Sequence, residues 1–281
     1  MAGVSMKAIK TRIKSMQSTR QITKAMELVA ASKLRSAQNR AIAARPYSEA
    51  LYAAMGEIAA SGLDLDSPYL RPRPAGKPLY VVIAGDRGLA GGYNSNILKL
   101  AWARMEGTDC VVLPIGRKAA EFFTHRGCDI LTDSFREASA LTIGGCYTIA
   151  RLLSRGFLNG QFSEACLGYT HFASLLSQTP ALLPLLPLSG IRAGGGRRGS
   201  LLYEGGPESV FNAIVPEYLG GTIFGALCES TASEQAARRM AMDAATKNAD
   251  DMISDLSLRY NQARQGAITQ EITEIVAGSE A

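Results

Sequence analysis

The sequence predicts an α/β protein in which N- and C-terminal helices form a long antiparallel coiled coil, joined by a central α/β domain with a mixed or parallel sheet. Two observations predict the coiled coil, because both ends of the 281-residue chain hold long proline-free segments with apolar residues at helical spacing. A third predicts the central domain, where strand-like runs alternate with helix-like stretches. We expect the N-terminal helix in residues 1–60, the α/β domain in 78–207 and the C-terminal helix in 208–281.

The N-terminal element contains no proline between residues 4 and 45. Its apolar residues form two triplets with spacings of four and then three: Ile9, Ile13, Met16 and Ile22, Met26, Val29. Because six positions separate the triplets, we expect an irregular coiled coil without a strict heptad repeat. About 40 helical residues would reach about 60 Å, which is longer than a compact domain requires. We expect Pro46 to kink or cap the helix before an alanine-rich stretch.

The middle of the chain alternates between two patterns. Strand-like runs occupy residues 79–85, 110–116 and 165–172, and helix-like stretches occupy 95–105, 117–125 and 138–155. A glycine- and arginine-rich segment, residues 193–199, is typical of an exposed loop. This alternation indicates a parallel or mixed sheet flanked by helices.

The C-terminal element contains no proline between residues 217 and 276. Its apolar stripes are Ala249, Met252, Leu256, then Ile253, Tyr260, Ala263, and finally Ile268, Ile272, Ile275. Neither terminal helix can bury its stripe alone, and antiparallel pairing solves the problem for both. Alanine is frequent in both elements, which permits close approach. The alternative is that both are ordinary helices packed in one bundle.

Charge is distributed unevenly along the chain. The formal net charge is +5, yet the first 45 residues hold 10 of the 30 basic side chains and one of the 25 acidic ones. The positive charge therefore belongs to one helix, and its partner should present acidic surface. Nucleic acid is a weaker candidate because those residues include no aromatic side chain for base stacking. A transit peptide would share this composition, but the helical pattern continues without a cleavage-like break.

Composition excludes several other classes of protein. The chain is 47% hydrophobic and 20% charged, which is typical of a globular protein. No run of about 18 uninterrupted apolar residues occurs, so we expect no transmembrane helix and membrane association only through a partner. The five cysteines are scattered without metal-ligand spacing, which predicts reduced and mostly buried thiols.

The glycine-rich turn Gly85 to Asn96 is the best candidate for small-molecule binding, because it follows a strand and precedes a helix. It lacks the lysine of a phosphate loop and the spacing of a dinucleotide fingerprint, so a structural turn is favoured over a nucleotide site. The two histidines, His125 and His171, have no nucleophile in a known arrangement. We therefore predict no catalytic residues, no metal and no cofactor. A nucleotide-binding α/β protein using this turn remains the alternative function.

Two long motifs resemble the gamma subunit family of rotary ATP synthases. Residues 21–47, QITKAMELVAASKLRSAQNRAIAARPY, are similar to its amino-terminal signature, and residues 233–281 are similar to its carboxy-terminal one. The turn GDRGLAGGYNSN, residues 85–96, resembles the family's glycine-rich turn. The resemblance covers nearly the whole chain, although residues 131–202 match weakly and lack the paired-cysteine insert of chloroplast relatives.

The resemblance implies a central-stalk rotor inside a hexamer of alpha and beta subunits. It implies torque transmission between a membrane ring and that hexamer, coupling ion flow to ATP synthesis or hydrolysis while the beta subunits perform the chemistry. It also implies an epsilon subunit and the c-ring as partners, and a peripheral location on the cytoplasmic face of a bacterial cell membrane. Whether protons or sodium ions drive the ring is a property of the membrane sector.

The resemblance also assigns contact residues by motif. Lys24 and Met26 match positions facing a beta-subunit lever loop that is acidic in the family. The beta-subunit catch loop matches a second set, comprising Arg264, Gln265, Thr269, Gln270 and Glu271. Tyr203 and Glu204 match the foot region near the ring and epsilon.

Overall fold

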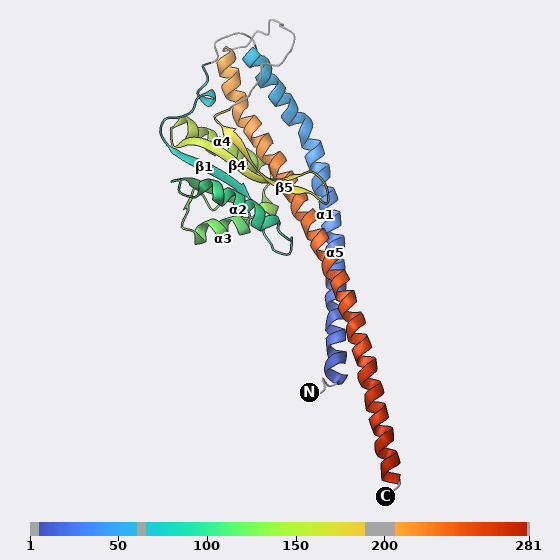
Figure 1. Cartoon of the computed structure of the whole chain (residues 1–281). Helices are drawn as coiled ribbons and strands as arrows, with labels where there is room; N and C mark the ends of the chain where they lie inside the picture. Colours follow the sequence, from blue (N-terminus) through green and yellow to red (C-terminus); the bar gives the residue numbers. More distant parts are fainter. Residues whose placement is uncertain (1–5, 61–65, 189–205, 280–281) are drawn as a thin grey trace. The chain divides into compact units, whose positions relative to one another are not determined.

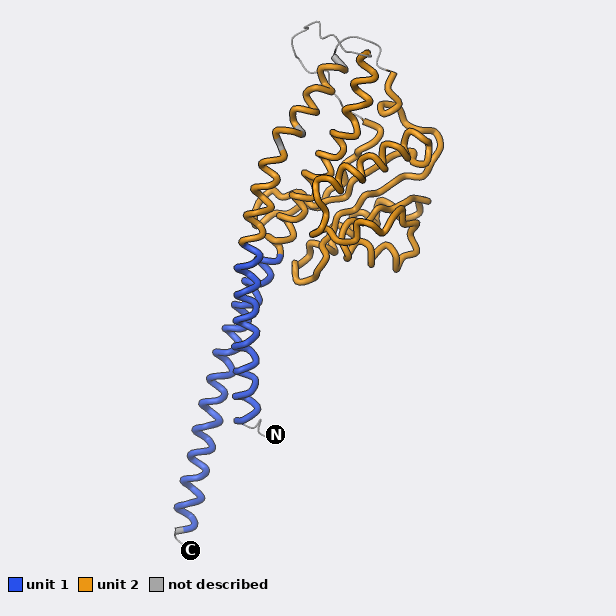
Figure 2. Tube along the Cα trace, turned by 180° about the vertical axis from the view of Figure 1, so that it is seen from behind, with its two compact units in different colours: residues 1–31, 238–281 blue, residues 32–237 orange. Residues whose placement is uncertain are grey.

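The computed structural model describes residues 6–60, 66–188 and 206–279. The chain divides into two compact units, one formed by Met1–Ala31 with Arg238–Ala281 and the other by Ser32–Ala237 (Figure 2). We call these unit 1 and unit 2. Two long helices, α1 (Met6–Ala60) and α5 (Pro207–Ser279), contribute residues to both units (Figure 1). The predicted terminal helices are therefore confirmed.

Prolines lie inside both long helices. Pro46 is internal to α1, and Pro216 is internal to α5. A proline removes one backbone hydrogen bond from a helix interior and crowds the preceding turn. The helix nevertheless continues through Pro46 to Ala60, so the expected cap at this proline is wrong.

Unit 2 contains a five-stranded sheet in the order β3-β2-β1-β4-β5. The strands are β1 (Lys77–Ile83), β2 (Val111–Ile115), β3 (Asp129–Ile130), β4 (Phe162–Phe172) and β5 (Gln178–Leu186). The helices are α2 (Tyr93–Met105), α3 (Arg117–His125), α4 (Ile143–Leu158) and the 3-10 turns η1 (Pro68–Leu70) and η2 (Ala138–Ala140). The first four strands in this order pair in parallel, and β4 pairs with β5 antiparallel. The sheet is mixed.

The sheet is larger than the sequence indicated. Three strands were expected and lie close to their predicted bounds, whereas β3 and β5 were not expected. The segment that forms β5 contains Pro180 and Pro184, and proline normally argues against a strand because it cannot donate to the ladder. Since β5 is an edge strand, only one of its sides needs backbone donors, and the prolines are tolerated there.

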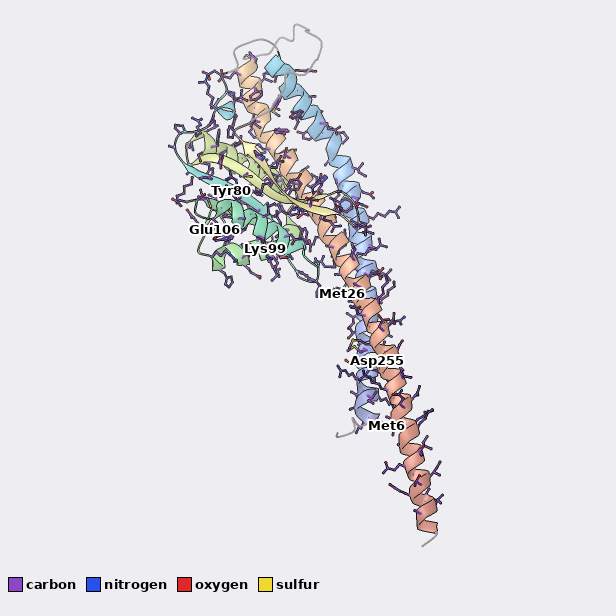
Figure 3. The ribbon with its side chains drawn as sticks, in the orientation of Figure 1. Met6, Met26, Tyr80, Lys99, Glu106 and Asp255 are labelled. Atoms are coloured by element: carbon purple, nitrogen blue, oxygen red, sulfur yellow. The ribbon has the colours of Figure 1, made fainter. Side chains whose placement is uncertain are left out.

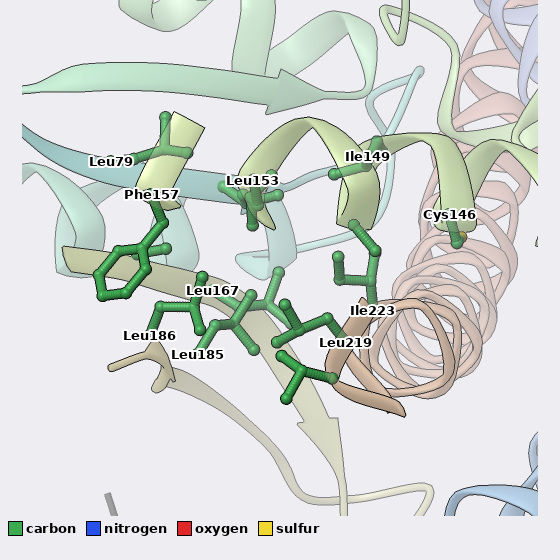
Figure 4. Packing of buried hydrophobic residues seen from close by; sticks show 14 of the residues in the cluster. Leu79, Cys146, Ile149, Leu153, Phe157, Leu167, Leu185, Leu186, Leu219 and Ile223 are labelled. Atoms are coloured by element: carbon green, nitrogen blue, oxygen red, sulfur yellow. The ribbon is translucent and has the colours of Figure 1, made fainter. Parts of the chain in front are cut away.

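Hydrophobic clusters cover both faces of the sheet. On one face, α2 and α3 pack over Tyr80, Val82 and Val112. On the other, α4 and the first part of α5 pack over Leu79, Val81 and strands β4 and β5. Figure 4 shows Ile149 and Leu153 of α4 and Leu219 and Ile223 of α5 gathered around Leu167. The predicted mixed or parallel sheet flanked by helices is confirmed, and the sheet is mixed.

The first part of α5 is a core helix. Phe211, Val215, Leu219 and Ile223 repeat every four residues and are fully buried. Burying each such side chain stabilises the fold by about 1.5–3 kcal/mol. By length and composition alone, α5 is also the one helix among the described residues that could cross a membrane. Packing against the sheet accounts for its apolar character, because a buried core helix has the same composition.

Candidate partner-binding surfaces

Two antiparallel helical segments make up unit 1 (Figure 2). The Oγ1 atoms of Thr23 and Thr246 lie 2.8 Å apart, and Arg20 Nε lies 2.5 Å from Asp250 Oδ1. From the first contact to the second, the position moves three residues toward the start of α1 and four residues toward the end of α5. The two segments are therefore antiparallel, and these two contacts define their register. Each hydroxyl also lies within hydrogen-bond distance of a carbonyl oxygen on its own helix, Thr246 at 2.8 Å from the Met242 oxygen and Thr23 at 3.1 Å from the Arg20 oxygen, so either threonine can be the donor in the cross-helix bond.

The contact row between the segments is a regular heptad seam. On α1 it contains Ile9, Ile13, Met16, Arg20, Thr23, Glu27 and Ala30, and on α5 it contains Met242, Thr246, Ala249, Ile253, Leu256, Tyr260 and Ala263. Both rows alternate spacings of four and three, which is the pattern of a left-handed coiled coil. The expectation of an irregular coil is wrong. Polar side chains at three seam positions of α1 concealed the repeat.

The second predicted stripe of α1 does not face α5. Ile22 is 58% exposed and Val29 is 55% exposed, while their neighbours Thr23 and Ala30 are buried. Met26, the middle residue of that stripe, is half-buried (Figure 3). These three side chains follow the four-then-three spacing of one helix face and form an apolar row on α1 outside the seam, whereas the exposed Leu28 lies on another side of the helix. We call Ile22, Met26 and Val29 the outer apolar row.

Lys24 is exposed and lies on a different side of α1 from this row, because residues two apart on a helix do not share a face. Its ammonium group contacts Glu27 Oε2 at 2.9 Å, and that carboxylate belongs to the seam with a side chain only 12% exposed. An exposed pair of this kind contributes little to stability. The Lys24 side chain therefore remains available to a partner while its stem covers the edge of the seam.

The end of α5 extends past the paired region. At the register of the two cross-helix contacts, Met6 lies opposite residue 263 or 264. Beyond this point α5 carries Ile268, Ile272 and Ile275 on one face, and Ile275 is 72% exposed. We call residues 264–279 the tip. Exposed apolar residues at helical spacing on a single helix indicate a surface that another chain covers.

All five catch-loop candidates lie on the tip and are exposed, namely Arg264, Gln265, Thr269, Gln270 and Glu271. Thr269 Oγ1 donates to the Gln265 carbonyl oxygen at 2.9 Å, and Gln270 Nε2 donates to Glu274 Oε1 at 2.9 Å. Arg264 makes no ion pair with any residue in the described part of the chain. Its guanidinium can therefore offer its full fork of donors to a partner.

The N-terminal segment of unit 1 is strongly basic. Between residues 6 and 31 it carries six basic side chains and one acidic one, whereas residues 238–279 carry five basic and six acidic. Within the described ranges, Lys7, Lys10, Arg12 and Lys14 are exposed and make no ion pair. This end of α1 thus presents an unneutralised positive surface, as predicted, to any acidic neighbour.

The glycine-rich turn after β1 is occupied by the chain's own polar groups. Asp86 accepts hydrogen bonds from the backbone amides of Arg117 (3.3 Å), Ala138 (2.8 Å) and Ser139 (2.9 Å). Burial acts to raise the pKa of Asp86, but these bonds outweigh it and hold the pKa below its ordinary value. Asn94 Oδ1 accepts from the Gly85 amide at 2.8 Å.

An acidic side chain also lies against this turn. A Cβ placed on Gly85 would sit 3.0 Å from the Glu234 carboxyl group. Two carboxylates and an amide oxygen therefore fill the space where a phosphate would need donors. The geometry favours a structural brace joining β1, α3 and η2 over a nucleotide site.

The other side chains that could take part in catalysis or metal binding form contacts within the fold. His171 Nδ1 lies 2.6 Å from Glu229 Oε2 and His125 Nδ1 lies 2.6 Å from the Glu121 carbonyl oxygen. No group of three or more His, Cys, Asp or Glu side chains in the described ranges could hold a metal ion. Of the five cysteines, Cys146 and Cys228 are buried and the other three are half-buried.

One pair of contact residues was not predicted from the sequence, and two predicted contact residues lie outside the ranges that the structure describes. Thr23 and Thr246 were not singled out from the sequence, and only the unbroken seam spacing would have marked them. Tyr203 and Glu204, the foot candidates, lie outside the described residues, as does the loop 193–199.

Comparison with known proteins places this geometry in a family. A family model described as ATP synthase matches residues 5–281. The ATP synthase gamma chain of Ruminococcus albus is 42% identical over 280 residues, 98% of each chain. The sodium-ion-specific ATP synthase gamma chain of Acetobacterium woodii is 37% identical over 293 residues, 97% of each chain. A chain in a structure of Euglena gracilis mitochondrial ATP synthase, containing OSCP, F1 and c-ring, shares the fold with a TM-score of 0.65 at 19% identity, covering 98% of this chain and 94% of that one.

The chain therefore combines a two-helix coiled coil, unit 1, with an α/β domain, unit 2, and it exposes apolar and basic side chains on the coiled coil. The full-length similarity then identifies the family: the chain belongs to the ATP synthase gamma chains. It is a central-stalk rotor subunit, and it is non-catalytic.

Proposed function

We propose that this chain transmits torque between a membrane-embedded ring and a catalytic hexamer of alpha and beta subunits, with unit 1 as the shaft. The observation that carries the proposal is the regular heptad seam, which leaves an apolar row and an unpaired helical tip uncovered. A pair of helices whose seam side chains are packed against each other can turn as one body. The faces that the seam leaves exposed can then make contacts that differ from one neighbouring subunit to the next. The solved structure of a mitochondrial relative contains F1 and a c-ring, which supports this assignment of partners.

We assign the first beta-subunit contact to Lys24 and Met26. Met26 belongs to the outer apolar row, which water does not favour, and the exposed Lys24 supplies a positive charge on another side of the same helical turns. An apolar row on one side of α1 and a cation on another suit a partner that surrounds this helix with aliphatic and acidic side chains. The unpaired positive charge near the start of α1 extends the same electrostatic preference.

The second beta-subunit contact is the set of exposed polar side chains around the tip, namely Arg264, Gln265, Thr269, Gln270 and Glu271. Arg264 and Gln265 are adjacent and exposed, so together they can offer several donors to backbone carbonyls and carboxylates of a surrounding loop. Each charge-assisted hydrogen bond to such a loop would contribute about 1.5–3 kcal/mol.

The foot of the rotor is assigned to Tyr203 and Glu204, which would contact the c-ring and an epsilon subunit. These contacts would hold the chain at the cytoplasmic face of a bacterial cell membrane as a peripheral protein. The ring selects the coupling ion, and the sodium-ion-specific relative is consistent with a shaft that serves either ion.

The mechanism follows from unequal contacts. Each beta subunit has several conformations, and a contact present in only one of them shifts its population. A differential contact of about 5.5 kcal/mol converts a 1:99 population into 99:1. Rotation of one asymmetric rod therefore drives three equivalent subunits through different states in turn.

The test is the double variant Arg264→Ala and Gln265→Ala in the assembled ATP synthase. Loss of about 2 kcal/mol of differential contact corresponds to roughly a 30-fold change in a conformational equilibrium. We expect normal assembly or a modest drop in yield, with ATP synthesis and ATP-driven ion pumping in membrane vesicles reduced several-fold.

A matched control is Arg259→Ala. Arg259 is an exposed arginine one turn earlier on the same helix, and it already pairs with Asp255 at 3.0 Å. This control should retain normal synthesis. Normal yield together with unchanged ATP synthesis in the Arg264 and Gln265 variant would refute the assignment.

A further inference from the structure

Two half-buried thiols face each other at the end of the sheet. Val111 of β2 pairs with Asp129 of β3, and Val112 pairs with Ile130. Cys110 and Cys128 each stand one residue before these pairs, and therefore at the same register on neighbouring strands. Adjacent strands lie about 4.8 Å apart, and a disulfide spans Cα atoms about 4.4–6.8 Å apart. The spacing suits a disulfide.

Both side chains point to the same face of the sheet. Cys110 and Cys128 pack with Trp102, Phe122 and Ile130 against the cluster beneath α2 and α3. This agrees with the alternation of side chains along a strand, since Val112 and Ile130 lie on that face as well. Neither cysteine belongs to a ladder pair, so the local backbone can adjust to the shorter Cβ separation of a disulfide.

An independent contact holds the two strand starts together. Lys77 Nζ lies 2.9 Å from Asp109 Oδ1 and 3.7 Å from Asp129 Oδ2. These carboxylates neighbour the two cysteines in sequence, so one ammonium group bridges the ends of β2 and β3. The charges of the two thiols are also close enough to affect each other.

We propose that Cys110 and Cys128 form a reversible disulfide, a modification site in unit 2 that fastens the two-residue edge strand β3 to β2. The cross-link would close a loop that contains α3. It would protect the exposed end of the sheet under oxidising conditions, and it uses none of the surfaces assigned to the rotor.

The chemistry is thiol–disulfide exchange with a low-molecular-weight disulfide as the oxidant. The Cys128 thiolate attacks one sulfur of the oxidant, forming a mixed disulfide and releasing one small thiolate. The Cys110 thiolate then attacks the Cys128 sulfur, forming the internal bond and releasing the second small thiolate. The two protein protons pass to the two released thiolates, so the protein pair is oxidised by two electrons and the oxidant is reduced to two thiols.

The order of attack follows from the neighbouring charges. Burial raises the pKa of both thiols. Beside Cys128 the guanidinium of Arg126 offsets part of this rise. Beside Cys110 the ammonium group of Lys77 also offsets part of it, but Cys128 and Asp109 raise the pKa of Cys110 further. We assign the first attack to Cys128 because its environment adds a positive charge and no carboxylate that raises the pKa.

Cys166 provides the matched control. It is half-buried and packs against the same cluster, but it pairs with Tyr80 and so lies two strands away from β2. Two strand spacings, about 9.6 Å, exceed the reach of a disulfide.

The test treats the full-length chain with oxidised glutathione, blocks free thiols, digests with trypsin without reduction and analyses the peptides by mass spectrometry. We expect peptide 105–117 linked to peptide 127–136, a link that dithiothreitol removes. The Cys166→Ser variant should keep this link. The Cys110→Ser and Cys128→Ser variants should each lose it and carry glutathione on the remaining cysteine.

A second probe measures the sulfur spacing without an oxidant. Phenylarsine oxide condenses with two adjacent thiols and releases water. We expect it to block Cys110 and Cys128 together against alkylation and to leave Cys128 open to alkylation in the Cys110→Ser variant. Glutathione on both cysteines of the unaltered chain without a cross-link, or a cross-link to Cys166, would overturn the proposal.

Discussion

The hydrogen bond between Thr23 and Thr246 allows a quantitative test of the heptad seam. In the Thr23→Val variant, Thr246 keeps its bond to the Met242 carbonyl oxygen but loses the hydrogen bond with the Thr23 hydroxyl. A buried hydrogen bond contributes about 1 kcal/mol, so this variant should lose about that much of the free energy of unfolding. Thr246→Val should lose a similar amount, since Thr23 then retains only the weaker bond to the Arg20 carbonyl oxygen at 3.1 Å.

The double variant should be almost as stable as the unaltered chain. Replacing both hydroxyls by methyl groups of the same shape leaves no polar atom unpaired and adds apolar contact in the seam. The cycle of single and double variants should therefore give a coupling energy of about 2 kcal/mol, because the two single losses of about 1 kcal/mol each are absent from the double variant. Unfolding followed by circular dichroism at 222 nm, which reports the helices, would measure all four proteins.

The neighbouring ion pair serves as the contrast. The side chains of Arg20 and Asp250 are 52% and 49% exposed, so Arg20→Ala should change the free energy of unfolding by less than about 0.5 kcal/mol. A double variant clearly less stable than either single one would show that the two threonines do not face each other, and the seam register would then be wrong.

Three further predictions concern other parts of the chain. Gly116 has φ +97°, and an added Cβ would lie 2.1 Å from the Ala84 carbonyl oxygen. Gly116→Ala should therefore lower the free energy of unfolding by at least about 3 kcal/mol and lower Tm by roughly 6–12 °C. An unchanged thermal melt would contradict this prediction. Because folding lowers the pKa of Asp86, its carboxylate stabilises the fold above the ordinary value of 3.8, and this contribution is lost as pH falls through the folded pKa. The stability gap between the unaltered chain and Asp86→Asn should therefore shrink between pH 7 and about pH 3, and a constant gap would argue against it. Ile22→Ser alters a side chain that is 58% exposed, so it should leave the isolated chain within about 0.5 kcal/mol but weaken capture by an alpha/beta hexamer; equal capture would remove the outer apolar row from the contact surface.

The sequence located the candidate surfaces better than it oriented them. Motif resemblance selected Met26 and Arg264, and both are accessible at least in part. Which side of α1 is accessible could not be read from periodicity, because Ile22 and Val29 fit a helical stripe as well as Thr23 and Ala30 do. On a helix, neighbouring rows differ by about 100° of rotation, so two rows can each look like the buried face.

The sequence by itself determined the features that depend on local structure. Long proline-free segments with apolar spacing are sufficient for two helices, since helical hydrogen bonds join residues four apart. The parallel strands were recognisable because a strand buried on both faces is a continuous apolar run. The tight turn after β1 was recognisable from its glycines.

The tertiary structure decided what depends on residues distant in sequence. The seam register is set where α5 meets α1, more than 220 residues away along the chain for Thr23 and Thr246. The edge position makes a strand of the proline-containing segment Gln178–Leu186, because its ladder bonds come from β4 alone. The facing of Cys110 and Cys128 likewise follows from the pairing of β2 with β3. In each case the deciding energy is an interaction with a distant partner, which no local pattern encodes.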